Sequence, residues 1–302
     1  MAIQPRISEQ YRYGTTLDRI GNVKAMADDV NETAISGRKL KRISDDPVAT
    51  IRVLRNRTRI TNLDQFRKTL DFGRGYLAKT EDALSSIYES LIRAKELSIQ
   101  QSTSIYDEPS QKAVAEEIRQ ILNHVIILGN TTYDDKYVFG GFQTTQPPVS
   151  PDGHYLGDDG FIFVQVDEDS FRAINISGRE VFDVPASHEG KRPPLVKILE
   201  NMYDSLYIWD KEKLHQSMVD LDSAMNSVVS ITASLGARRV ALEDVSERLD
   251  RGESQLHSDN NNLEAADMVK SALDLRRAEH ALGFTLQASS KMLTPSLLEF
   301  LK

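Results

Sequence analysis

Apolar and small side chains recur every three or four residues over long stretches of this chain, which is the spacing of helices that pack along a shared seam. The first stripe covers residues 13 to 37, where Gly37 can adopt the left-handed conformation that ends a helix. The second stripe begins at Asp46, a suitable N-cap, and Pro47, a suitable first helical residue, and continues to about residue 105. Such a helix would be about 88 Å long, so it needs partner helices.

The C-terminal half repeats this pattern after a helix predicted from Pro109 to about Gly129. Helix resumes from Leu195 to about Ile208, a long stripe runs from 214 to 256, and a polar interruption follows at 258–262. A last stripe then continues to Leu293. We expect the first and last stripes to pair and to form the seams through which the protein assembles. The candidate assembly residues on these seams are Ile20, Val23, Val30, Leu275, Leu282, Leu286 and Leu293.

Between Tyr133 and Pro194 the helical spacing gives way to glycine, proline and short apolar runs, which are typical of strands and turns. The predicted fold is therefore mainly α with a small β insert (α+β). In it, N- and C-terminal segments form a long antiparallel helical rod and a terminal coiled-coil pair, and a β domain lies in the centre. The predicted domains are a terminal coiled coil of 1–43 with 260–302, a helical rod of 44–132 with 195–259, and a β-rich outer domain of 133–194.

The first stripe is short and poor in leucine, and it carries Ala27, Ala34 and Gly37 on its apolar side. A helix with so little apolar surface is marginal by itself. We therefore expect the termini to be disordered or weakly helical in the monomer and to become ordered when neighbouring subunits cover them. Strong protection of their amides from hydrogen exchange in a dilute monomer would contradict this expectation.

The composition removes several classes of function. The chain has no cysteine, which excludes disulfides, thiolate metal sites and cysteine nucleophiles, and no apolar run long enough to span a membrane. Its net charge of -8 makes nucleic acid a poor partner. Charged residues near the N-terminus, such as Arg6, Glu9 and Arg12, occupy the place of a signal peptide's apolar core, so we expect no cleaved signal.

Basic residues nevertheless outnumber acidic ones between 36 and 68. This region either meets acidic surface on an adjacent copy or partner, or is a solvated helix face, and the sequence favours neither interpretation.

No pattern of residues indicates catalysis, a cofactor or a metal. The six histidines are scattered, and Gly73–Gly75 lies inside a helical stripe, where close approach of two helices explains it better than a phosphate loop. The acidic groups Asp134–Asp135, Asp158–Asp159 and Asp167–Asp169 could hold calcium, but they lie among turns, where aspartate is common in any case. We expect no enzyme activity, no cofactor and no metal.

Particular stretches resemble the bacterial flagellin family. The stretch ISGRKLKRISDDP (35–47) is similar to the flagellin segment between the first two helices, AKELSIQQ (94–101) to the end of the second helix, and LGARR (235–239) to the C-terminal rod. The ending at 297–301 also fits this family. Residues 130–148 resemble members found at the hook–filament junction more than filament flagellins.

This resemblance implies a structural subunit that joins the hook-associated region to the flagellin filament as an adaptor ring. The implied partners are the preceding hook-associated protein, flagellin, further copies of the chain, and an export chaperone at the C-terminal helix. The implied location is the extracellular flagellum, reached through the flagellar type III system without a cleaved signal. The alternatives are a filament flagellin and, from another class, a secreted enzyme with its active centre in 133–194.

Overall fold

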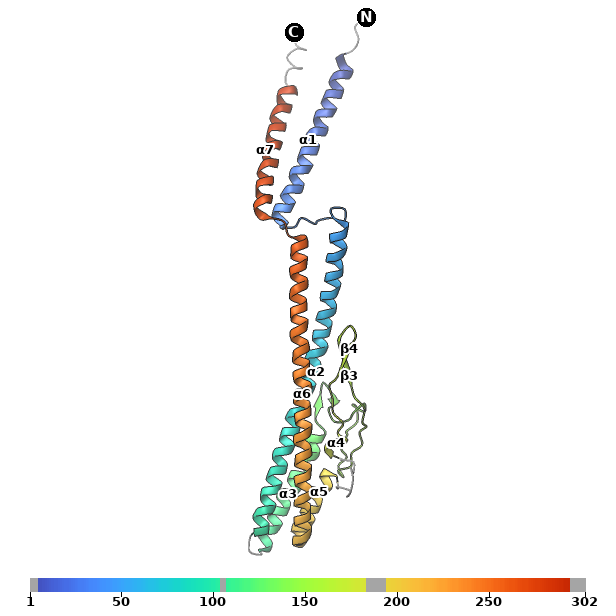
Figure 1. Ribbon diagram of the computed structural model, residues 1–302, viewed down its shortest axis with the longest axis vertical. Coiled ribbons are helices and arrows are strands. Elements are labelled where there is room, and N and C mark those ends of the chain that lie inside the picture. Colours follow the sequence, from blue (N-terminus) through green and yellow to red (C-terminus); the bar gives the residue numbers. More distant parts are fainter. Residues whose placement is uncertain (1–4, 104–106, 183–193, 294–302) are drawn as a thin grey trace. The chain divides into compact units, whose positions relative to one another are not determined.

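The computed structural model describes residues 5–103, 107–182 and 194–293 (Figure 1). The helices are α1 (Pro5–Ser36), α2 (Pro47–Thr103), α3 (Glu108–Gly129), α4 (Arg179–Phe182), α5 (Leu195–Ile208), α6 (Lys211–Glu264) and α7 (Met268–Leu293). The strands are β1 (Thr132–Tyr133), β2 (Lys136–Tyr137), β3 (Phe163–Asp167) and β4 (Ser170–Ala173). These elements form two compact units, one from residues 61–252 and the other from residues up to 60 and from 253 onward. In the described chain no helix has both the length and the apolarity needed to cross a membrane.

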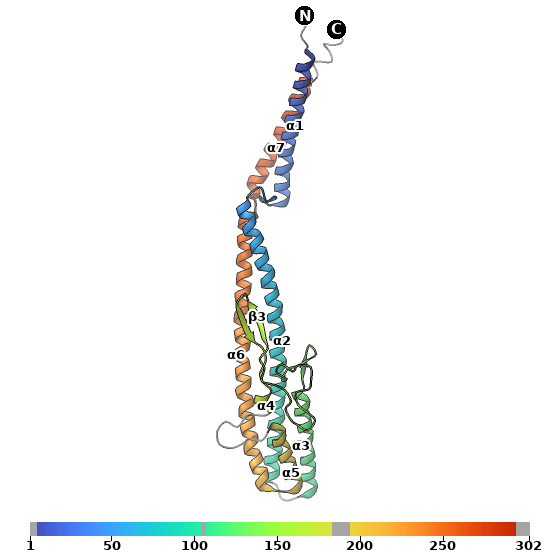
Figure 2. The same ribbon diagram turned by 90° about the vertical axis from the view of Figure 1, so that its right-hand side faces the viewer.

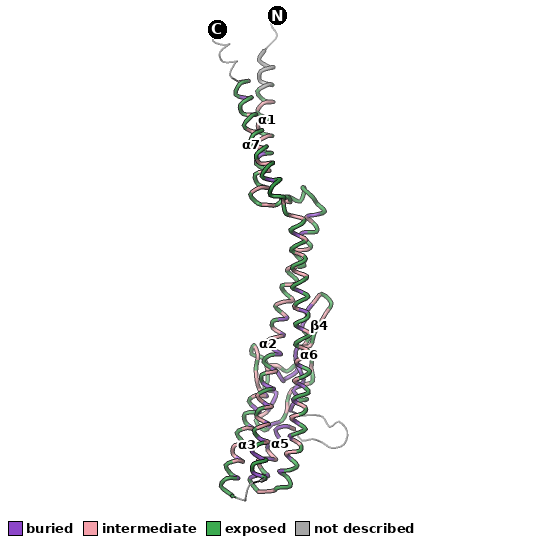
Figure 3. The backbone as a smooth tube through the Cα atoms, turned by 60° about the vertical axis from the view of Figure 1, so that its left-hand side comes forward, coloured by how far each residue is buried: buried purple, intermediate pink, exposed green. Residues whose placement is uncertain are grey.

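The first unit, residues 61–252, is a bundle in which α3, α5 and long parts of α2 and α6 lie side by side (Figures 1 and 2). Each helix turns its predicted apolar stripe inward, so the mainly helical fold class is confirmed. Buried residues are concentrated along the inside of this bundle (Figure 3). Its fully buried side chains include Leu84, Ile87, Leu91, Ile118, Val125, Ile198, Leu199, Leu221 and Leu235.

Local signals set the ends of these helices close to where the sequence predicts them. Pro109 lies in the first turn of α3, where a missing N–H group is harmless. Helix α5 ends because Trp209 adopts a left-handed conformation with φ of 62°, and the next N–H group, of Asp210, donates to the carbonyl of Ser205 at 2.8 Å. A new helix, α6, begins directly afterwards.

The small β insert is also confirmed, as two antiparallel hairpins. Strand β1 pairs with β2, and β3 pairs with β4. Asp134 and Asp135, which connect β1 to β2, both have positive φ values of 51° and 58°, as a two-residue hairpin turn requires. Strands β3 and β4 lie largely within two of the short apolar runs of the insert, Phe161 to Val166 and Phe171 to Ile176.

The insert packs directly on the helices of the bundle. Its side chains Phe139, Ile174 and Phe182 are completely buried in the same apolar cluster as the helix residues. Tyr76 of α2 donates its hydroxyl to the carbonyl of Val138 at 3.0 Å, and burial raises the pKa of this phenol. The helices and the insert therefore share one core.

The glycines in α2 show where this contact is closest. A Cβ atom at Gly73 would lie 2.9 Å from Cγ2 of Ile174, and one at Gly75 would lie 2.0 Å from the hydroxyl oxygen of Tyr133. Both neighbours belong to the insert. The expected helix–helix approach at Gly73–Gly75 is therefore wrong in its partner: glycine is needed here because the insert, more than another helix, lies against α2.

The second unit contains α1, α7, the first turns of α2 and the end of α6. Asn56 of α2 donates its side-chain amide to the side chain of Asn260 at 2.9 Å, and Asn260 is buried. Arg57 forms an ion pair with Glu264 at 2.6 Å. The predicted interruption at 258–262 is wrong, because Asn260 has a partner on α2 and α6 continues to Glu264.

Candidate assembly surface

Helices α1 and α7 pack against each other, and their contact contains most of the predicted seam. On α1, Ile20, Val23 and Val30 are half-buried, and Ala27 is buried between them. The burial pattern of α1 thus follows the predicted three–four spacing.

The register of the seam on α7 differs in part from the prediction. Leu275 and Leu282 are half-buried as predicted, whereas Leu286 is 49% exposed. Among the described side chains of α7, Ser271 and Ser289 are the buried ones. Small side chains let α1 approach along that line, and the larger Leu286 lies at its margin. Leu293 is the last residue of α7, and its side chain lies outside the described residues.

Both helices are fully formed in the structure, whereas the sequence predicts disordered or weak helices for a monomer. Their mutual contact supplies apolar burial that neither stripe has alone. Most described residues of the pair are exposed or intermediate (Figure 3), and large apolar side chains are among the exposed ones. Its exposed large apolar residues are Tyr11, Tyr13, Leu17, Met26, Ile35, Met268, Val269, Leu273, Phe284 and Leu286. An apolar surface of this extent is typical of an interaction site.

The connector between α1 and α2, residues 37–46, crosses the connector between α6 and α7. Gly37 has a φ of 65° and ends α1, and its carbonyl accepts from the N–H group of Ala266 at 2.8 Å. The N–H group of Lys39 donates to the carbonyl of Glu264 at 2.8 Å. The two connectors thus form a short antiparallel bridge centred on Arg38 and Ala265.

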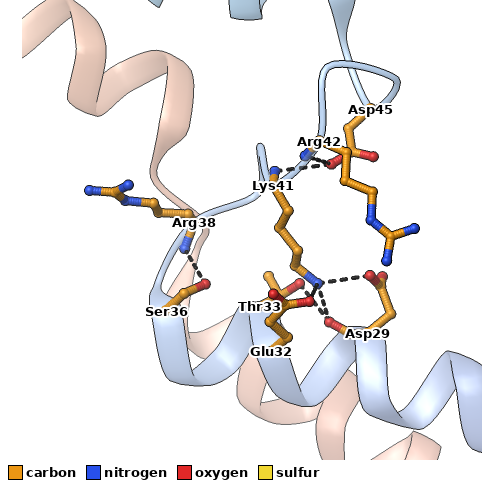
Figure 4. Close-up of polar contacts among 8 residues, drawn as sticks. All are labelled: Asp29, Glu32, Thr33, Ser36, Arg38, Lys41, Arg42 and Asp45. Carbon is orange, nitrogen blue, oxygen red and sulfur yellow. Dashed lines mark hydrogen bonds and ion pairs between the residues drawn. The ribbon is translucent and has the colours of Figure 1, made fainter.

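Lys41 fixes the connector to α1 (Figure 4). Its ammonium group lies 2.9 Å from a carboxylate oxygen of Asp29 and 3.6 Å from one of Glu32, and it also donates to the main-chain carbonyl of Asp29. The Lys41 side chain is only 11% exposed. A lysine buried to this extent needs such partners, so the connector is held in one conformation.

Asp45 closes a turn at the other end of the connector (Figure 4). Its carboxylate accepts from the N–H groups of Arg42 at 2.8 Å and Lys41 at 3.0 Å. These bonds, that from Arg42 first, lower the pKa of Asp45. The turn is therefore fully stabilised above the ordinary pKa of 3.8 and loses this support only as the pH falls through the lowered value. The next residue, Asp46, caps α2 as predicted, accepting from the N–H group of Ala49 at 2.9 Å.

Residues 7–144, which include most of α1 and all of the connector, α2 and α3, match the bacterial flagellin N-terminal helical region. This part of the chain is similar to the flagellin family. The stretch 35–47 that carries the resemblance in the sequence is the connector held by Lys41 and Asp45. The segment that carries the resemblance is therefore a folded turn.

A hook-associated protein and a flagellin are among the proteins that are similar to this chain. Flagellar hook-associated protein 3 of Escherichia coli is 25% identical over 260 residues, which cover 80% of this chain and 82% of the relative. The flagellin of Halalkalibacterium halodurans is 24% identical over 265 residues, which cover 87% and 85%. The solved flagellar junction protein FlgL of Legionella pneumophila has the same fold, with 18% identity, a TM-score of 0.59, and coverage of 71% of this chain and 100% of the other.

The acidic residues of the insert stabilise its turns. Asp158 accepts from the N–H groups of Phe142 at 2.7 Å and Gly160 at 2.9 Å. Asp159 accepts from the hydroxyl of Ser177 at 2.6 Å. Among the described residues, histidines and carboxylates form no group of three or more that could hold a metal ion. These carboxylates therefore have a structural task in holding loops of the insert on one another.

Replacing Lys41 by methionine is expected to loosen the connector. The change keeps the length of the side chain but removes the ammonium group, and the contact with Asp29 and Glu32 is lost. Hydrogen exchange measured by mass spectrometry should be about three to ten times faster across residues 38–46, since one partly buried charged contact contributes about 1 kcal/mol. The matched control is Lys24→Met, because Lys24 is exposed on α1, the helix that Lys41 contacts. Equal exchange in the two variants would show that Lys41 does not hold the connector.

Proposed function

We propose that this chain is the adaptor subunit that joins the hook-associated region of a bacterial flagellum to its flagellin filament. The terminal pair of helices carries the proposal. It has the seam of a coiled coil inside and a row of exposed apolar residues outside, including Leu17, Leu273 and Phe284. Surface of this kind is stable only when other subunits cover it. Similarity to hook-associated protein 3 over 80% of the chain agrees with this function.

Filament flagellin is the alternative, because a flagellin matches the chain with nearly the same identity. The segment after α3 favours the adaptor. Flagellins typically have an Asn-Phe-Asn-Gly pattern there, whereas this chain has Asn130–Tyr133 followed by the turn at Gly140 and Gly141. Asn130 fixes this segment by donating to and accepting from the main chain of Val149 at 2.9 and 3.0 Å.

The proposed partners follow from this position. Copies of the chain would form a ring, with the preceding hook-associated protein on one side and flagellin on the other. Before assembly, an export chaperone would cover the C-terminal helix, and the chain would leave the cell through the flagellar type III system without a cleaved signal. Neither catalysis nor a cofactor is part of this proposal.

In this proposal each of the three predicted domains has its own position in the assembly. Residues 1–43 with 260–302 would form the inner coiled coil of the assembly, 44–132 with 195–259 the rod, and 133–194 the outer surface. The seam residues on α1 and α7, Ile20 to Leu293 as defined above, would hold the inner layer together.

Deleting the gene tests the function directly. Cells without this chain are expected to bear hooks without filaments and to release unpolymerised flagellin into the medium, because the first flagellin subunits have nothing to assemble on. Electron microscopy of hook–basal bodies and immunoblots of the medium measure both outcomes. Normal filaments on such cells would contradict the adaptor function. Growth of long filaments from seeds by the purified chain would instead support the flagellin alternative.

A further inference from the structure

The first turns of α2 carry an exposed face that is both apolar and basic. We call it the basic face and define it as Val48, Ile51, Arg52, Leu54, Arg55 and Arg59. The opposite side of the same turns is buried, at Ala49 and Val53. The basic face therefore points away from the core of its own unit, and Val48, Ile51 and Leu54 are each more than half exposed.

The charges of the basic face are not balanced within the chain. No acidic residue occurs from Pro47 to Leu63, and Arg52, Arg55 and Arg59 form no ion pair with any residue that the structure describes. Arg55 and Arg59 are four residues apart, so their like charges repel each other along the helix. An ordinary solvated helix face alternates charges of both signs and does not combine unpaired arginines with isoleucine and leucine. Leaving these arginines unpaired and these apolar side chains in water is therefore energetically unfavourable in the isolated chain.

Helix α6 carries the opposite kind of surface. We call it the acidic face and define it as Val229, Ala233, Gly236, Val240, Glu243, Asp244 and Glu247. Val229 and Val240 are about half exposed, and the three carboxylates form no ion pair within the described chain. Apart from the adjacent pair Glu243 and Asp244, these residues follow one another at steps of three and four, which is the spacing of a helix that packs against a second helix. It is a second stripe, separate from the buried stripe of α6 at Leu221, Leu235 and Leu242.

Gly236 lies within the acidic face and is not explained by the fold of one chain. A Cβ atom there would have no neighbour within 4 Å. Glycine inside a helix costs about 0.5–1 kcal/mol relative to alanine, and no residue that the structure describes requires it here. A helix of another molecule that approaches the backbone closely would require it.

We propose that the basic face of one copy packs along the acidic face of a neighbouring copy. This inference rests on the proposed function, in which copies stand side by side. Each face offers three unpaired charges of opposite sign around apolar residues, so contact would pair the charges and remove the apolar groups from water. Because the two faces differ, each copy uses one face toward each neighbour, and such head-to-tail contacts repeat around a ring or a helix.

Charge reversal tests this contact. One variant carries R52E, R55E and R59E, a second carries E243R, D244R and E247R, and a third carries all six changes. Each triple variant is expected to reduce the share of hooks that bear filaments at least about tenfold, since like charges then face each other. The sixfold variant restores the pairing, with reversed signs, and is expected to return to within about twofold of the unmodified chain.

The sixfold variant separates this proposal from its rivals. Recovery can occur only if both faces meet on copies of this chain. If the sixfold variant assembles no better than the triple variants, the faces bind other proteins and the inference is wrong, while the adaptor function stands as long as the deleted strain lacks filaments. Normal filaments with either triple variant would also overturn the contact. Circular dichroism of each secreted variant shows whether it has kept its helices.

Crosslinking provides a second measurement that does not depend on the reversed charges. Because the natural chain has no cysteine, copies with I51C and tagged copies with V240C each carry one thiol. A flexible bis-maleimide applied to flagella that contain both copies should yield a mixed dimer. The matched control replaces V240C with I208C, since Ile208 is exposed on α5, away from the acidic face. Equal crosslinking of the two pairs, or no mixed dimer with V240C, would overturn the proposal.

Discussion

A chain that carries both Leu275→Asp and Leu282→Asp is expected to reach the medium and still leave hooks without filaments. Both leucines are half-buried on α7, which packs on α1. Burying one leucine fully contributes about 1.5–3 kcal/mol, and a carboxylate in its place adds a desolvation cost. Two such changes would weaken the terminal pair by several kcal/mol, so we expect fewer than about one hook in a hundred to bear a filament. Counting hooks by electron microscopy measures this effect.

The matched control replaces the same two residues by methionine. Leucine and methionine have similar volumes, so Leu275→Met and Leu282→Met should cost less than about 1.5 kcal/mol each and allow assembly. The aspartate variant should also keep the thermal transition of the 61–252 unit, because neither residue belongs to it. Filaments of normal number and length on cells with the aspartate variant would show that the seam on α7 is not needed for assembly.

This expectation links the sequence pattern to the assembled state. The same helices that pack on each other inside one chain expose further apolar residues, such as Tyr13 on α1 and Phe284 on α7. The inner seam holds α1 and α7 together, and burial of the outer apolar residues favours association of this pair with other subunits. A carboxylate in place of a seam leucine should therefore abolish assembly even where the outer residues are unchanged.

The helices could be predicted from the sequence because their signals are local. A stripe of three and four residue steps extends through α2 and α6, Asp46 and Pro47 mark the beginning of α2, and Gly37 marks the end of α1. The connector could be recognised by its resemblance, but the ion pair of Lys41 with Asp29 spans twelve positions and follows no sequence rule.

The features that could not be predicted depend on contacts between distant segments. The asparagine run at 260–262 has the composition of a loop, yet α6 continues through it to Glu264. Asn260 there accepts a hydrogen bond from Asn56, which is 204 positions away in the sequence. The seam register on α7 depends on which small residues α1 can approach, and this exposes Leu286. The glycines of α2 gave a signal of close approach, but only the fold shows that the insert is what approaches.

The acidic face is the clearest surface that sequence reasoning missed. Its residues share the three–four spacing with the buried stripe of the same helix, and the stronger stripe hides the weaker one. The excess of basic residues between 36 and 68 was visible in the sequence, but its position on an exposed helix face was not. A second search of each long helix, after removal of its buried stripe, would have found Val229, Val240 and Glu247 together.

Phe182→Ala is expected to destabilise the helical bundle as a whole, although Phe182 belongs to the insert. Its ring is completely buried and packs edge-on against Phe139, with 5.5 Å between the ring centroids. Gly129 at the end of α3 lies so close that a Cβ atom there would be 2.8 Å from the ring. Removing a buried phenylalanine costs about 3–5 kcal/mol, because the surrounding side chains fill the cavity only in part. Urea denaturation followed by circular dichroism at a helix wavelength should therefore show a much lower midpoint.

The helix signal decides between a shared core and a separate outer domain. With a shared core, loss of Phe182 lowers the midpoint at which α2, α3, α5 and α6 unfold, in one transition. The matched control is Phe163→Ala, since Phe163 lies on β3 and is 61% exposed, and it should change the free energy of unfolding by less than about 0.5 kcal/mol. An unchanged helix midpoint in Phe182→Ala would mean that the insert folds independently. In that case the whole insert could change in sequence without destabilising the helices. With a shared core, only exposed positions such as Phe142, Phe163 and Phe171 can change without this cost.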